Sequence, residues 1–229
     1  MFVQKKIINP TPAWAMLRTL MLIATVSGFL VVFSYSISKP YIEKNKQQAI
    51  EKALFELVIN ANLKKEFMIV ADKILPISNN HQESEVKPLY ALYDKQGKLI
   101  SLALAAEAIG YQDKIQLLYT FEPYCQCIRG IKVLKMAETP GIGDKIAVDK
   151  DFLQNFIKLD AQLANDGQAL KHKIVAVKHG KKQNLWEIDA ISGATISSSA
   201  VARMINQSAQ QYAPIIMKQL SVLEIKSES

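Results

Sequence analysis

The stretch Asp189-Ala-Ile-Ser-Gly-Ala-Thr195 joins a predicted strand, residues 184–188, to a predicted helix, residues 196–211. A threonine at the start of a helix lies beside backbone N–H groups that have no partner inside the helix, and the helix dipole adds positive potential there. The two residues before Thr195 are Gly and Ala, so the approach to its hydroxyl is open. This arrangement suits a bound anion, although Ser and Thr are also common helix caps.

A second unusual loop, Glu138-Thr-Pro-Gly-Ile-Gly143, lies upstream. Pro140 fixes one backbone dihedral, and Gly141 and Gly143 permit a tight, left-handed backbone. Backbone N–H groups near the two glycines can approach a ring system closely, and Thr139 offers a hydroxyl. An ordinary turn would also explain this loop if it stood alone.

Together the two loops resemble the FMN-binding domain of the Rnf G subunit and the Nqr C subunit. The pairs Gly110-Tyr111 and Val133-Leu134 also match, as does the sequence after Gly143, Asp144-Lys-Ile146. The flavin transferase of this family recognises a D-x-x-S/T-G-A-T pattern, which residues 189–195 match at every fixed position. The resemblance implies that Thr195 holds FMN through a phosphoester. It also implies a cofactor site made of Glu138, Thr139, Pro140, Gly141, Ile142, Gly143, Ser192, Gly193, Ala194 and Ser198.

Two details refine this resemblance. The run Gly143-Asp144-Lys145-Ile146 looks more like the Rnf G subunit than the Nqr C subunit. Family members often carry a histidine two residues before the loop glutamate, where this chain has Met136, which we expect to pack or to contact the ring.

The composition excludes several other classes of protein. The length of 229 residues suits one domain with an appended helix. The net charge of +7 is spread along the chain, and no basic run alternates with aromatic residues, so we expect no nucleic-acid partner. Three histidines and two cysteines are too few and too scattered to predict a metal site.

An uncharged segment of 20 residues, Thr19 to Ser38, lies between Arg18 and Lys39. At 1.5 Å per residue, about 20 helical residues cross the roughly 30 Å hydrocarbon core of a bilayer. A signal peptide is the alternative, but no A-x-A-like cleavage site precedes Lys39-Pro40. We therefore expect an uncleaved transmembrane helix in contact with membrane lipid.

The charges that flank this segment do not decide its orientation. Three cations precede it and four follow it closely: Lys5, Lys6 and Arg18, then Lys39, Lys44, Lys46 and Lys52. The family resemblance implies the bacterial inner membrane, with residues 1–18 in the cytoplasm and the flavin domain on the periplasmic side.

Periodicity predicts an α+β fold of antiparallel strands with flanking helices. We expect a membrane-proximal helical segment within residues 39–86, an FMN-binding domain at 87–211 and a C-terminal tail at 212–229. The expected elements are a helix at 41–60, a loop at Asn79–His81, a hairpin of 89–93 with 99–104, strands at 115–121 and 127–134, a short helix at 152–159, and a second hairpin of 173–178 with 184–188.

Cys125 and Cys127 lie near a predicted hairpin turn. They can form a small, strained disulfide of the labile kind, remain free thiols, or supply half of a metal site shared with another subunit. A structural role is the simplest interpretation.

The resemblance implies a membrane-anchored electron-transfer subunit with covalent FMN, in an Rnf-type ion-translocating ferredoxin:NAD oxidoreductase complex. Its partners would be the other membrane subunits and, during maturation, a flavin transferase. The flavin supplies the redox chemistry, so no catalytic acid, base or nucleophile is expected. The alternatives are the C subunit of a Na+-translocating NADH:quinone reductase, a flavin-free membrane-tethered binding or assembly module, and a thiol redox protein.

Overall fold

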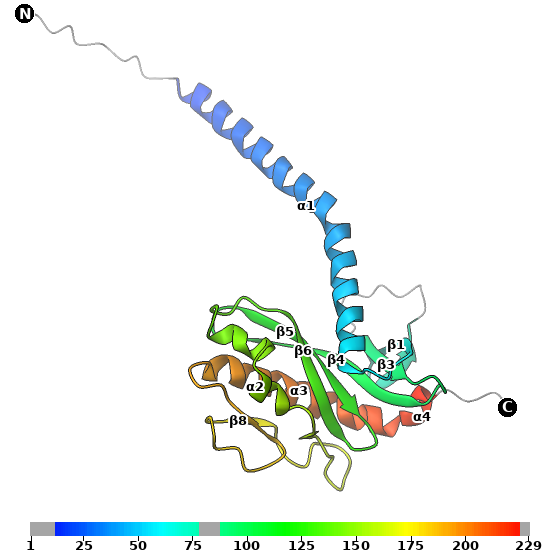
Figure 1. Cartoon of the computed structure of the whole chain (residues 1–229). Coiled ribbons are helices and arrows are strands. Elements are labelled where there is room, and N and C mark those ends of the chain that lie inside the picture. Colours follow the sequence, from blue (N-terminus) through cyan, green and yellow to red (C-terminus); the bar gives the residue numbers. More distant parts are fainter. Residues whose placement is uncertain (1–11, 78–87, 225–229) are drawn as a thin grey trace, which may run out of the picture. The chain divides into compact units, whose positions relative to one another are not determined.

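The computed structural model describes residues 12–77 and 88–224 (Figure 1). The chain divides into two units, Met1–Gln48 and Ala49–Ser229. The loop expected at Asn79–His81 lies outside the described residues.

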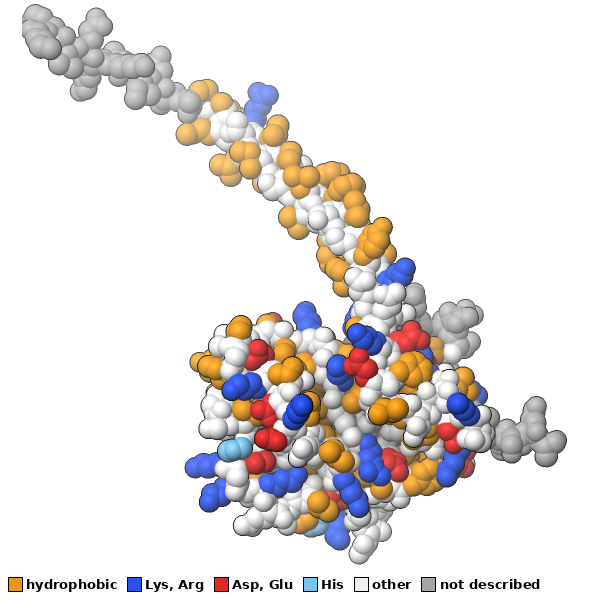
Figure 2. Space-filling view, in the orientation of Figure 1, with side chains coloured by type: hydrophobic (Ala, Val, Ile, Leu, Met, Phe, Trp, Pro, Cys, Tyr) orange, Lys and Arg blue, Asp and Glu red, His pale blue; other side chains and the backbone are white. Residues whose placement is uncertain are grey.

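Helix α1, Ala13–Leu57, contains the whole uncharged segment. Large apolar side chains are exposed along it, and Figure 2 shows them as orange groups along the long helix. Its length and composition are sufficient to cross a membrane. The helix expected at 41–60 is a continuation of this same helix, which passes through Pro40 and ends at Leu57.

Within the described part of the second unit, seven strands form one antiparallel sheet in the order β2-β1-β3-β4-β5-β6-β7. This confirms the α+β class, the first hairpin and the two strands expected after it. The strands are β1 Leu63–Val70, β2 Lys73–Pro76, β3 Pro88–Tyr93, β4 Leu99–Ile109, β5 Lys114–Glu122, β6 Cys127–Lys135 and β7 Leu159–Asp160.

Both faces of the central sheet are buried, which explains why β3 reads as a continuous apolar run. Leu89 and Tyr93 belong to the larger core, together with residues of helix α3, Thr195–Lys218. Leu92 points to the other face and packs with Leu54 from the end of α1. Figure 1 shows α3 running along the sheet.

Helix α3 does not end at Gln211 as expected but continues to Lys218. Tyr212 and Ile216 are buried against the core, so the residues after 211 add apolar contacts that keep the helix intact. A short helix α4, Leu220–Leu223, follows, and the Tyr93 hydroxyl donates to the Leu223 carbonyl at 2.7 Å. The segment expected to be a tail therefore packs on the domain up to this point.

Residues 39–86 were expected to be helical, but strands β1 and β2 follow the end of α1. The charged run Lys64 to Glu66 hides the strand pattern in the sequence. Phe67 and Met68 are buried, while the charged residues before them lie near the edge of the sheet, where polar side chains are common.

The second expected hairpin is wrong, because β8, Val175–Val177, and β9, Glu187–Asp189, pair in parallel. The connection folds back along the strands instead of turning directly. Asp189 accepts a hydrogen bond from the Gly180 N–H, and Glu187 accepts from the Gln183 and Asn184 N–H groups. These bonds hold the returning chain so that β9 starts beside the start of β8.

The helix expected at 152–159 is shorter and begins earlier. A 3-10 turn, η1 Gly143–Ala147, precedes α2, Lys150–Gln154. Asp149 caps α2 by accepting from the Phe152 N–H at 2.9 Å. The Asn155 amide donates to the Phe152 carbonyl, and this competing bond ends the helix before β7.

The contact between the end of α1 and the sheet can be tested with Leu54→Ala. Leu54 is 0% exposed, so its truncation should leave a cavity and lower the free energy of unfolding by about 2–5 kcal/mol. Ile59→Ala is the control, because Ile59 is 88% exposed. Urea unfolding followed by circular dichroism measures both; equal effects would show that Leu54 does not hold this face.

Candidate functional site

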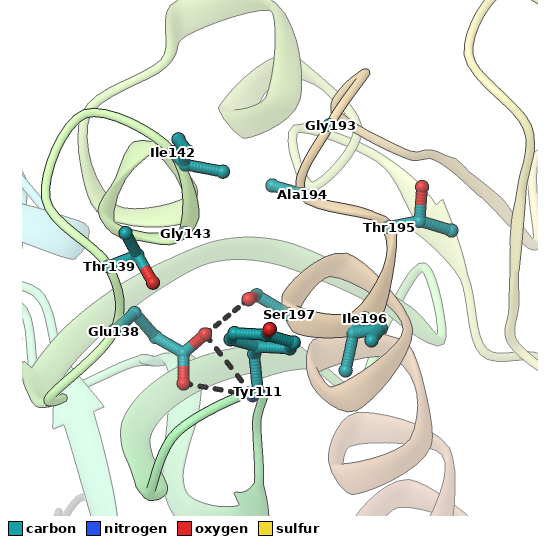
Figure 3. A pocket seen from close by; sticks show the side chains of 10 residues that line it. All are labelled: Tyr111, Glu138, Thr139, Ile142, Gly143, Gly193, Ala194, Thr195, Ile196 and Ser197. Carbon is teal, nitrogen blue, oxygen red and sulfur yellow. Dashed lines mark hydrogen bonds between the residues drawn. The ribbon is translucent and has the colours of Figure 1, made fainter.

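The two loops singled out in the sequence meet at one cavity of about 500 Å³ (Figure 3). One wall comes from the chain between β6 and η1, and the other from the start of α3. A third segment, between β4 and β5, also contributes. The lining residues are Tyr111, Glu138, Thr139, Ile142, Gly143, Gly193, Ala194, Thr195, Ile196 and Ser197.

Seven of the predicted site residues line this cavity, and four do not. Pro140 and Gly141 belong to the turn but are absent from the lining. Ser192 lies in a neighbouring cavity of about 280 Å³. Ser198 is buried, and its hydroxyl accepts the Ile191 N–H at 3.1 Å, so it holds the loop before α3 rather than facing the cavity.

Three lining residues were not predicted: Tyr111, Ile196 and Ser197. Tyr111 could have been predicted, because the pair Gly110-Tyr111 matched the family pattern. Ser197 lies two residues after Thr195 and carries a hydroxyl, but the sequence gives no sign that it meets Glu138. Ile196 reads as an ordinary apolar residue of the helix.

The Glu138 carboxylate joins the three segments that form the cavity. It is 6% exposed and accepts hydrogen bonds from the Tyr111 N–H at 3.0 Å and the Gln112 N–H at 3.3 Å. The Ser197 hydroxyl donates to its other oxygen. A buried carboxylate is tolerated only when donors replace its lost water, so these bonds fix the relative positions of the loops.

Two glycines allow this close packing around the carboxylate. A Cβ on Gly110 would collide with Glu138 Oε1 and lie 2.6 Å from Ile115 Cδ1. A Cβ on Gly143 would lie 2.9 Å from Glu138 Cβ. Gly143 was expected to provide left-handed backbone, but that conformation belongs to Gly141, with φ of +76°, and to Gly193, with φ of +83°.

The loop that carries Glu138 is closed by its own backbone. The Thr139 carbonyl accepts the Ile142 N–H at 3.2 Å and the Gly143 N–H at 3.0 Å. The Gln112 side-chain amide donates to the Thr139 hydroxyl at 3.1 Å, which adds a second link to the β4–β5 connection. The conformation of the loop is therefore fixed by its own hydrogen bonds.

Thr195 is the first residue of α3 and is exposed. Figure 3 shows its hydroxyl pointing away from Glu138. Within the described residues, the N–H groups of Thr195, Ile196 and Ser197 have no acceptor, and Ala194 before them supplies no side-chain cap. Free N–H groups and the positive end of a helix dipole are what an anion requires.

The rim of the cavity is apolar. Tyr111, Ile142 and Ile196 come from three different segments, and each is at least half exposed. Exposed large apolar side chains around a concave site favour a ligand with a flat, largely apolar body. The site thus combines an apolar rim with an anion-binding helix terminus.

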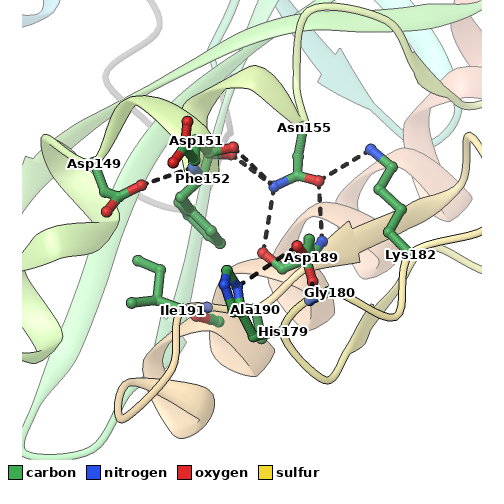
Figure 4. Close-up of polar contacts among 11 residues, drawn as sticks. Asp149, Asp151, Phe152, Asn155, His179, Gly180, Lys182, Asp189, Ala190 and Ile191 are labelled. Carbon is green, nitrogen blue, oxygen red and sulfur yellow. Dashed lines mark hydrogen bonds and ion pairs between the residues drawn. The ribbon is translucent and has the colours of Figure 1, made fainter.

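A buried amide fixes the strand that leads into the Thr195 loop (Figure 4). Asn155 Oδ1 accepts the Asp189 N–H at 3.0 Å and the Lys182 ammonium at 3.0 Å, and its Nδ2 donates to the Asp189 carbonyl at 3.3 Å. Burial lowers the pKa of Lys182, while the carboxylates of Asp189 and Glu187 oppose that shift. Asn155 therefore ties the end of α2 to the end of β9.

The region that contains this cavity matches a known protein family. The FMN-binding domain family matches residues 110–210, which include both loops. The G subunit of an ion-translocating oxidoreductase complex from Methanosarcina acetivorans is 25% identical, over 80% of this chain and 85% of its own. The protein of the same name from Pasteurella multocida is 29% identical, over 83% of this chain and 88% of its own.

Solved structures share the fold. The C subunit of the Na+-translocating NADH-quinone reductase of Parabacteroides distasonis superposes with a TM-score of 0.61, 18% identity and coverage of 78% of this chain and 96% of its own. NqrC of Shewanella oneidensis superposes with a TM-score of 0.56 and 19% identity, and the match covers 73% of this chain and 87% of its own.

The role of the Glu138 carboxylate in joining the three segments can be tested with Glu138→Gln. The amide keeps the shape but replaces one acceptor oxygen with a donor that faces N–H groups, so the free energy of unfolding should fall by about 1–3 kcal/mol. Asp113→Asn, an exposed charge removal in the adjacent loop, is the control. Urea unfolding measures both, and a Glu138→Gln protein as stable as the control would contradict this role.

The Asn155 tie predicts that Asn155→Leu destabilises the domain, because the Asp189 N–H and carbonyl lose their partner inside the protein. We expect a loss of about 1–3 kcal/mol. Gln154→Leu changes an exposed amide at the next position and should alter stability by less than about 0.5 kcal/mol. The midpoint of thermal unfolding distinguishes the two variants.

The matched loops, the cavity that they enclose and the shared fold agree: residues 110–210 match the FMN-binding domain family, and the chain is similar over most of its length to the G subunits of ion-translocating oxidoreductase complexes.

Proposed function

We propose that this chain is a membrane-anchored electron-transfer subunit with FMN held by a phosphoester to Thr195. The observation that carries the proposal is the place of Thr195: an exposed hydroxyl at the start of α3, on the wall of a cavity. The cavity volume of about 500 Å³ falls within the range of ligand pockets. Matches to an FMN-binding family and to G-subunit relatives support the choice of cofactor.

The residues present fit FMN. The free N–H groups of Thr195, Ile196 and Ser197 suit the phosphate, and the exposed Thr195 hydroxyl leaves room for an attaching enzyme. Tyr111, Ile142 and Ile196 suit the flat ring system. Glu138 is already occupied by three protein donors, so its role is to position the walls.

Bound FMN supplies the redox chemistry, and the protein supplies position, electrostatics and protection from water. In this proposal Thr195 forms a bond once, during maturation by a flavin transferase. Its hydroxyl loses a proton, its oxygen bonds to the flavin phosphorus, and one phosphorus–oxygen bond of the flavin donor breaks to release the leaving group. No side chain then needs to exchange a proton for electrons to pass.

The host is proposed to be an Rnf-type ion-translocating ferredoxin:NAD oxidoreductase complex. A relative from Clostridium ljungdahlii, 26% identical over 86% of this chain, is named as the G subunit of a proton-translocating ferredoxin:NAD+ oxidoreductase complex. We further propose that residues 19–38 of α1 cross the bacterial inner membrane, with the domain at 87–211 on the periplasmic side. The other membrane subunits and lipid would then be the partners.

The second candidate is the role of the C subunit in a Na+-translocating NADH:quinone reductase, which is favoured by the shared fold alone. The G-subunit relatives align over most of their own length, which favours the first candidate. A flavin-free binding or assembly module does not account for the free N–H groups and the apolar rim meeting at one cavity.

The attachment site is tested by expressing the full chain with a flavin transferase and comparing it with Thr195→Ala. The normal chain should give a fluorescent denatured gel band and an intact mass raised by FMN less one water. Thr195→Ala should be dark and unmodified, because it lacks the nucleophilic oxygen.

Ser199→Ala is the matched control, because Ser199 lies one turn further along α3 and does not line the cavity. It should carry FMN normally. A flavin on Thr195→Ala, or a dark normal chain beside a transferase shown to be active on another substrate, would contradict the proposal.

A further inference from the structure

Cys125 and Cys127 are joined by a disulfide in the turn between β5 and β6, with a Cα–Cα distance of 5.2 Å. Of the three alternatives that the sequence allowed, the structure therefore contains the small disulfide. The proposed function above makes no use of it.

The disulfide is not needed to hold this turn. The strands on either side pair at Glu122 and Cys127, and the Gln126 N–H donates to the Pro123 carbonyl at 3.3 Å. The Gln126 carbonyl and side-chain oxygen accept the N–H groups of Ala161 and Leu163, at 3.0 and 2.9 Å. A bridge that spans a single residue also removes the least entropy from the unfolded chain, since that gain grows with loop length.

The bridge closes over a strained backbone. Gln126, the residue between the cysteines, has a φ of +50°, a left-handed conformation that costs free energy for any residue except glycine. The hydrogen bonds of Gln126 hold this conformation without the bridge, so opening the bridge leaves the turn in place.

The two sulfur atoms differ in access. Cys127 is 2% exposed, whereas Cys125 is only partly buried and follows the exposed Tyr124. An incoming thiolate therefore reaches the Cys125 sulfur, and Cys127 is the leaving sulfur. The Glu122 carbonyl oxygen lies 3.6 Å from Cys125 Sγ, where it can accept the S–H of a reduced Cys125.

A carboxylate lies beside both sulfur atoms. A Glu122 carboxylate oxygen and both sulfur atoms lie within 4.8 Å of one another. Glu122 pairs with Arg129 at 2.6 Å, which keeps the carboxylate beside the turn.

The turn is remote from the FMN cavity. Tyr111 precedes β5 and Glu138 follows β6, while the cysteines lie at the other end of these strands. At about 3.3 Å per residue, nine-residue strands separate the two ends by about 25–30 Å. A group bound in the cavity is therefore too far away to react with the cysteines directly.

We propose that Cys125 and Cys127 form a redox-active dithiol/disulfide centre whose partner is a dithiol. A partner thiolate attacks Cys125 Sγ, forming a mixed disulfide and breaking the bond to Cys127, which leaves as a thiolate and takes a proton from water. The second thiolate of the partner then attacks its own sulfur in the mixed disulfide and releases Cys125, which is protonated in turn. The partner dithiol is oxidised to a disulfide, and the cysteines are reduced to two thiols.

The first test is reduction of the native full-length protein in detergent with dithiothreitol, followed by maleimide labelling and intact mass. The proposal predicts that two thiols become labelled while the protein stays folded, and that Thr195→Ala behaves identically because the flavin takes no part. A disulfide that is reduced only after denaturant is added would overturn it.

The second test separates the two sulfur atoms with single variants. Cys127→Ser leaves the accessible Cys125 thiol, and Cys125→Ser leaves the buried Cys127 thiol. With 5,5′-dithiobis(2-nitrobenzoate), Cys127→Ser should react at least about tenfold faster than Cys125→Ser, because reactivity follows access to the sulfur. Equal rates, or a faster reaction of the Cys127 thiol, in proteins with unchanged thermal midpoints would refute attack at Cys125. If either variant unfolds, the first test, reduction of the native protein, decides alone.

Discussion

The buried carboxylate of Glu138 is the constraint on which the candidate site depends. A charge that is 6% exposed must find donors in the protein, and these come from two places far apart in the chain, the β4–β5 connection and the first turn of α3. Gly110 and Gly143 let the backbone come close enough for these bonds to form. The walls of the cavity are thus placed by one side chain before any ligand binds, which lowers the entropy that binding must overcome.

The core sets the other half of the site. Helix α3 is buried along its length against the sheet, with Val201 and Ile205 inaccessible to solvent. Its register on the sheet therefore fixes where its first turn lies, and Thr195 takes its position from packing rather than from bonds of its own. The Asn155 tie acts on the preceding strand, so the loop that carries Thr195 is held at both ends.

Features that depend on neighbouring residues could be predicted from the sequence, whereas features that depend on long-range contacts could not. The hairpin of β3 and β4 and the two cavity loops could be predicted, because turn glycines and a change of period are encoded within a few neighbouring residues. The bond between Ser197 and Glu138 could not, since it joins residues 59 positions apart. The parallel pairing of β8 and β9 was missed because side-chain bonds to Gly180 and Gln183 turn the connection back, and such bonds leave no periodic signal.

Strands β5 and β6 have the cavity at one end and the disulfide turn at the other, and the sheet between these ends is rigid. β5 is bonded on both sides, to β4 and to β6, and its inward side chains are buried. A change at the turn therefore does not reach the cavity by a shift of register, since sliding one strand would expose every buried side chain on it. The two proposed sites use different parts of the domain. The candidate flavin site is built from loops and a helix terminus, whereas the cysteine pair lies in a turn, and the hydrogen-bonded strands between them keep the two independent.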